Sequence, residues 1–139
     1  MITTGILLKA NEARLVTLTG NREDYAVADS DTNKLSIAKA PSQSDVAHFI
    51  QQLSSYLEQA GTQKLIVNRR ATTGQGAGGA GTFILEGVIL ASVKVPVEFV
   101  HPATLRATDK RCSGLKVARP KTVDMGKAFD LAFEGLLAG

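Results

Sequence analysis

Hydrophobic and polar residues alternate in two short stretches near the start of the chain. Residues 5–9 (GILLK) form an aliphatic run, and in residues 13–19 (ARLVTLT) aliphatic side chains alternate with threonines. A period of two is typical of half-exposed antiparallel strands. The pattern predicts two strands joined by a tight turn at Asn11-Glu12, and a third strand over residues 34–38.

A helical repeat begins after a short polar segment that contains Ser42 and Ser44. Apolar residues then recur every three or four positions from Val46 to Leu57, which is the spacing of one buried helix face. Either serine can cap the start of this helix, and Gly61 can end it. The short apolar run at residues 64–68 (KLIVN) predicts a buried strand after it.

The second half of the chain alternates helical and strand patterns. Residues 82–92 (TFILEGVILAS) are apolar on nearly all sides, which predicts a helix buried between layers. Residues 95–100 predict the last strand, a short helix is expected from Pro102, and residues 122–137 predict the final helix. This order predicts an α/β fold: a mixed five-stranded sheet, with three antiparallel strands before the αβ units, flanked by helices.

Length and composition narrow the functional classes. The 139 residues fit one domain over residues 1–139. The net charge of +3 permits a nucleic-acid or phosphate-bearing partner without requiring one. The single cysteine, Cys112, fits a reducing compartment, and the opening segment shows no signal peptide or membrane span. We therefore expect a cytoplasmic protein without a membrane partner, and no cofactor motif stands out.

A cationic, glycine-rich segment follows the predicted strand at residues 64–68. Five glycines occur between residues 74 and 81. Ligands of α/β proteins meet the carboxyl ends of strands, and backbone amides at a helix start favour anions. The candidate ligand-binding residues are Arg69, Arg70, Gly76, Gly78 and Gly79. Two structural alternatives stay open: the glycines form only a mobile loop, and Arg69 pairs with internal carboxylates.

A basic tract precedes the last helix. It consists of Arg106, Lys110, Arg111, Lys116, Arg119 and Lys121. Such a tract is a solvated face or a contact surface for a nucleic-acid backbone.

Four segments together resemble the ribonuclease H-like superfamily, in particular its branch of RuvC-type Holliday-junction resolvases. They are GILLKANEARLV, KLIVNRRATTGQGAGGAGTFILEG, VPVEFVHPATLR and AFDLAFEGLLAG, which span nearly the whole chain. More narrowly, the chain resembles a small uncharacterised bacterial domain family of that fold. The resemblance implies a ribonuclease H-like fold whose active members hold two divalent metal ions with acidic residues from separate elements.

The resemblance also implies that the metal-binding acids are lost. The first-strand acid falls at Leu7 and the second at Arg69, which leaves Glu86, Asp124 and Asp130 as residual acids. We expect no metal and no catalysis, and we expect Arg69 to bridge the residual acids. The implied function is binding of nucleic acid or a phosphate-bearing ligand. The alternatives are a metal-dependent nuclease with relocated acids and a non-enzymatic homodimeric interaction protein.

Overall fold

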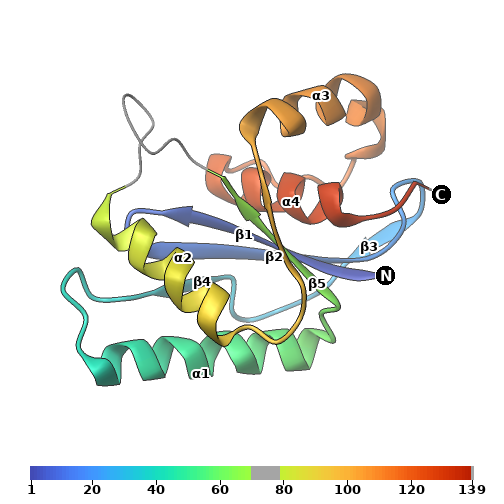
Figure 1. The fold of residues 1–139 in the computed structure, drawn as a ribbon. Helices are drawn as coiled ribbons and strands as arrows, with labels where there is room; N and C mark the ends of the chain where they lie inside the picture. Colours follow the sequence, from blue (N-terminus) through green and yellow to red (C-terminus); the bar gives the residue numbers. More distant parts are fainter. Residues whose placement is uncertain (70–78, 139) are drawn as a thin grey trace.

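The centre of the molecule is a mixed sheet between two helical layers (Figure 1). The computed structural model describes residues 1–69 and 79–138. In spatial order the sheet runs β3-β2-β1-β5-β6, and β4 pairs with β2 off this path. β1 is antiparallel to β2 and parallel to β5, which is parallel to β6. The strands are β1 (Ile2–Lys9), β2 (Glu12–Gly20), β3 (Tyr25–Val27), β4 (Lys34–Ser36), β5 (Lys64–Asn68) and β6 (Val97–Val100).

Helices cover both faces of the sheet. Figure 1 shows α1 and α2 on one face, and α4 on the other with α3 outside it. Side chains of β1 alternate between these layers, so that Ile6 and Leu8 join the core beneath α1 and α2 while Leu7 packs against α4. The helices are α1 (Gln43–Ala60), α2 (Ala80–Ser92), α3 (Pro102–Cys112) and α4 (Val123–Gly135), with a 3-10 turn over Ser113–Leu115. No helix in the described part of the chain is long and apolar enough to cross a membrane.

The structure confirms the predicted α/β architecture and corrects two details. The strand β3 was not predicted, because it is only three residues long and lies in a segment of mixed pattern; it pairs with β2, where Val27 lies opposite Leu18. The helix α2 was predicted to be buried all round, which is wrong. Phe83 and Leu90 are 45% and 59% exposed, because α2 packs on its neighbours through one face only.

The strand β1 and the helix α4 approach closely at Gly5. A Cβ atom at Gly5 would meet the Ala128 carbonyl oxygen and the Ala132 backbone nitrogen, and would lie 2.9 Å from Leu131 Cβ. The hydroxyl of Thr3, on the same face of β1, donates to the Ala132 carbonyl oxygen at 2.8 Å. The missing side chain at Gly5 therefore allows α4 to lie directly on the central strand.

The start of α1 is held by a reciprocal capping pair. The Asp45 backbone N–H donates to Ser42 Oγ at 3.2 Å, and the Ser42 backbone N–H donates to Asp45 Oδ2 at 2.9 Å. The hydrogen bond from the Ser42 backbone holds the pKa of Asp45 below its usual value of 3.8. A carboxyl whose pKa is lowered on folding stabilises the fold above its unfolded pKa, and this contribution disappears as pH falls through the folded pKa.

Ser42→Ala is expected to destabilise the protein by about 1 kcal/mol at neutral pH, because it removes the acceptor for an N–H of the first helical turn. Urea denaturation at pH 7 measures this loss. The matched control is Ser44→Ala, since Ser44 lies inside α1 and, among the described residues, its hydroxyl forms a hydrogen bond only with that of Ser42. Equal losses for the two variants would contradict the capping role.

Candidate functional site at the carboxyl ends of the parallel strands

Three strand ends and three helix starts meet at one edge of the sheet. Because β1, β5 and β6 are parallel, their last residues, Lys9, Asn68 and Val100, lie along this edge. The helix α3 follows β6 almost directly, and α2 docks on the β1–β2 turn, where Thr82 Oγ1 donates to the Ala10 carbonyl oxygen at 2.9 Å.

The helix starts at this edge carry no side-chain caps. At the N-cap residues of α2, α3 and α4, which are Gly79, His101 and Thr122, no capping side chain accepts a hydrogen bond from the first turn. Helix N-termini carry a partial positive charge and present N–H groups. These helix starts favour an anion at this edge, and ligand binding by Gly79, the N-cap residue of α2, stays a prediction. Arg70, Gly76, Gly78 and the predicted mobile loop lie outside the described residues.

Arg69 occupies the opposite side of the sheet from Leu7. Its backbone N–H donates to the Val100 carbonyl oxygen at 2.8 Å, and its guanidinium lies 4.1 Å from the ring centroid of Phe99. Phe99 packs against the core beneath α1 and α2, whereas Leu7 packs beneath α4. Arg69 is exposed, and it does not stand beside Leu7, although the resemblance assigned both residues to one metal site.

Asn68 reaches the end of β1 instead. Its Oδ1 accepts from the Leu8 N–H at 2.8 Å, and its Nδ2 donates to the Leu8 carbonyl oxygen at 3.2 Å. The side-chain amide thus continues the hydrogen bonding between β5 and β1 beyond the last paired residues. Sequence reasoning passed over this residue, although alternation along residues 64–68 could have separated its direction from that of Arg69.

Two of the three residual acids, Asp124 and Asp130, are compensated by cations other than Arg69. Asp124 Oδ1 lies 3.5 Å from Lys9 Nζ. Asp130 is buried and accepts from Lys116 Nζ at 3.0 Å and from Arg119 Nε at 2.9 Å. The predicted bridge from Arg69 to Asp124 and Asp130 is therefore wrong.

Asp130 also faces away from the strand ends. The residues of α4 that lie on Gly5 are Ala128, Leu131 and Ala132, so the intervening Asp130 points to the side where the α3–α4 connection carries Lys116 and Arg119. The hydrogen bonds that the Arg119 guanidinium donates to the Asp130 carboxylate raise the pKa of Arg119. Glu86 lies on α2, in the other helical layer. The three acids are thus dispersed over both faces of the sheet.

A family model described as "Protein of unknown function (DUF3010)" matches residues 1–135. The chain belongs to the DUF3010 family. No similar sequence is found among curated proteins.

Solved structures give the DUF3010 chain a ribonuclease H-like fold. RuvC from Thermus thermophilus, in complex with a Holliday-junction substrate, superposes with a TM-score of 0.72 at 15% identity, covering 96% of this chain and 90% of RuvC. A second T. thermophilus RuvC structure gives the same TM-score at 14% identity. This match covers 96% of the DUF3010 chain and 92% of RuvC. A Ppx/GppA family member from Aquifex aeolicus matches with a TM-score of 0.50 at 11% identity, covering 85% of this chain and 40% of that protein.

The described donor atoms at the strand ends do not fit a two-metal centre. Mg²⁺ requires converging oxygen ligands, chiefly carboxylates. On the α4 side, Leu7 is buried and apolar, the amide of Asn68 is bound to the backbone of β1, and Asp124 is paired with Lys9. Within residues 1–69 and 79–138, no three His, Cys, Asp or Glu side chains are grouped to hold a metal ion.

Proposed function

We propose that the DUF3010 chain binds nucleic acid through the phosphate backbone and does not cleave it. The observation that carries this proposal is the distribution of charge. Residues 102–138 contain seven Lys or Arg and four Asp or Glu, so this segment carries the whole net charge of +3. The rest of the chain is electrically balanced.

The acids of the α3–α4 layer are all neutralised by ion pairs. Asp109 contacts Lys116, Asp124 pairs with Lys9, Asp130 pairs with Lys116 and Arg119, and Glu134 pairs with Arg22. Five exposed cations of the same layer have no ion-pair partner among the described residues: Arg106, Lys110, Arg111, Lys121 and Lys127. We call these five residues the basic face.

Two further features support a contact with phosphates. Uncapped helix starts adjoin the basic face at the strand ends, where their N–H groups favour anions. Aromatic residues are scarce, and Phe129 and Phe133 are buried in the core, so base stacking is not favoured. The shared fold with RuvC, which is known in complex with a DNA junction, supports the proposal by analogy.

Removal of two cations from the basic face is expected to weaken binding and its salt dependence together. For Arg106→Ala/Lys110→Ala, the slope of log K against log salt should shrink by about 2 on duplex DNA. Fluorescence anisotropy with labelled duplex and branched DNA over a salt series measures both quantities. The control is Lys39→Ala/Lys94→Ala, which removes two exposed cations outside the α3–α4 layer.

Two results would refute the proposal. Equal weakening by both double variants would show a non-specific effect of net charge. Cleavage of the bound DNA on addition of Mg²⁺ or Mn²⁺, abolished by Asp124→Asn, would show a working metal centre and would restore the nuclease alternative.

A further inference from the structure

The edge of the sheet next to α1 is interrupted. β3 and β4 both pair with β2, at its opposite ends, and residues 28–33 connect them. This connection stays attached to β2 at two points only: the Ala28 N–H donates to the Thr17 carbonyl oxygen at 2.9 Å, and the Leu15 N–H donates to the Asn33 carbonyl oxygen at 3.0 Å. The residues between them leave the sheet, and such interruptions at sheet edges redirect side chains.

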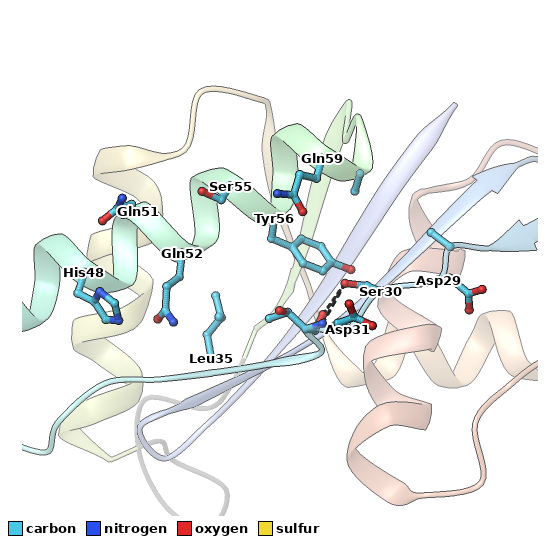
Figure 2. A pocket seen from close by; sticks show the side chains of 13 residues that line it. Asp29, Ser30, Asp31, Leu35, His48, Gln51, Gln52, Ser55, Tyr56 and Gln59 are labelled. Atoms are coloured by element: carbon cyan, nitrogen blue, oxygen red, sulfur yellow. Dashed lines mark hydrogen bonds between the residues drawn. The ribbon is translucent and has the colours of Figure 1, made fainter.

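A groove of about 750 Å³ lies between this connection and α1. Figure 2 shows one wall made by α1, with Gln51, Gln52, Ser55 and Gln59, and the other made by the connection, with Asp31. The lining residues of α1 extend from His48 to Ala60. Twelve steps of about 1.5 Å along the helix axis make this wall roughly 18 Å long, which suits a linear ligand.

The floor of the groove is buried and largely apolar. It is formed by Leu35 and by Tyr56, which points from α1 toward the connection (Figure 2). The Tyr56 hydroxyl forms a hydrogen bond of 2.8 Å with Thr17 Oγ1. Thr17 Oγ1 also lies 2.7 Å from Thr4 Oγ1, and Thr4 Oγ1 lies 2.7 Å from Thr62 Oγ1. This buried chain of hydroxyls holds the tyrosine ring in place. Burial also raises the pKa of Tyr56, so its hydroxyl stays neutral at physiological pH.

The lining favours a ligand that is positively charged and donates hydrogen bonds. It contains two carboxylates, Asp29 and Asp31, and three glutamine amides, but no Lys or Arg. Among the described residues, these five side chains form no hydrogen bond with another residue, so their acceptor oxygens are free for a ligand. An anion would meet two carboxylates and, apart from His48, no basic side chain, whereas ammonium groups would find charged and neutral acceptors.

We propose that this groove binds a linear aliphatic polyamine. Its ammonium groups donate to Asp31, Asp29 and the glutamine amides, and its methylene groups lie over Leu35 and Tyr56. The groove lies on the α1 side of the sheet, away from the basic face, so this site is independent of the proposed nucleic-acid contact.

Calorimetric titration with spermidine at fixed ionic strength tests the proposal on the full chain. We expect saturable binding at one site and none with inorganic phosphate. Asp31→Asn removes a charge-assisted hydrogen bond and should weaken spermidine binding about tenfold or more.

A matched pair of variants on α1 distinguishes the groove from general electrostatics. Ser55→Arg places a long cation inside the groove, whereas Ser54→Arg adds the same charge one residue away, where Ser54 borders a different cavity beside Val93 and Val95. Both serines are exposed, so both variants should fold. We expect about tenfold or greater weakening for Ser55→Arg and less than about twofold for Ser54→Arg.

Three results would overturn the proposal. They are an absence of saturable spermidine binding to the unmodified chain, equal weakening by Ser54→Arg and Ser55→Arg, and tighter binding of a tetralysine peptide than of spermidine. The last result would identify the occupant as a basic peptide segment instead.

Discussion

Gly5→Ala is expected to destabilise the protein by about 3 kcal/mol or more, or to prevent folding. The added methyl group would meet two backbone atoms of α4, at Ala128 and Ala132, and backbone cannot turn aside as a flexible side chain can. Relief requires α4 to move off the central strand, which would open the core that contains Leu7, Ile66 and Phe129. Urea denaturation followed by circular dichroism measures the loss.

The same substitution on α2 provides the control. Apart from the chain neighbours and the backbone of α2 itself, no heavy atom of the described residues lies within 4 Å of a Cβ added at Gly87, and the residue is exposed on the helix. Gly87→Ala should therefore stabilise the protein by up to about 1 kcal/mol, through helix propensity alone. A loss below about 1 kcal/mol for Gly5→Ala would mean that α4 does not lie as close to β1 as the structure places it.

Asp130→Ala is expected to cost about 3–5 kcal/mol. The side chain of Asp130 is 7% exposed and that of Lys116 is 4% exposed, so truncation leaves a buried ammonium with Asp109 as its remaining carboxylate partner. Lys116 also lies 5.0 Å from the ring centroid of Phe133, which confines it further. Chemical denaturation at neutral pH measures the effect.

Asp124→Ala is the matched control on the same helix. Its partner, Lys9, is 70% exposed, so water replaces the lost ion pair and the cost should stay below about 1 kcal/mol. A second variant isolates the buried charge. Asp130→Leu/Lys116→Met removes both buried groups together and should recover much of the stability lost in Asp130→Ala. Equal stability of Asp130→Ala and Asp124→Ala would show that Asp130 is not part of a buried ion pair.

The local pattern of the sequence was sufficient for most elements of the fold. The helix α1 begins after Ser42 and ends at Gly61, as its serines and glycine predicted, because capping depends on residues only a few positions apart. The strand β5 occupies the predicted residues 64–68, because a short aliphatic run bounded by polar residues is typical of a buried strand. The sequence also showed the basic tract directly, since the charge of a lysine or arginine side chain does not depend on the fold.

Only the tertiary structure showed in which direction the side chains of the candidate site residues point. Arg69 follows the strand end, and only the position of Phe99 on the neighbouring strand shows which face its guanidinium takes. The helix α4 is buried on nearly all sides, so its apolar pattern could not show whether Asp130 faces β1 or the α3–α4 connection. Its partners Lys116 and Arg119 meet it only because the connection folds back on α4.

The groove beside α1 also could not be predicted from the sequence. Its two walls come from residues 28–32 and 48–60, and the polar residues of each look like ordinary solvent-exposed positions when read alone. Pairing of β3 and β4 with opposite ends of β2 brings these walls together. The sequence by itself thus determined the elements and the total charge, because both are local or additive properties. The tertiary structure decided which side chains share a face, because that depends on contacts between residues far apart in the chain.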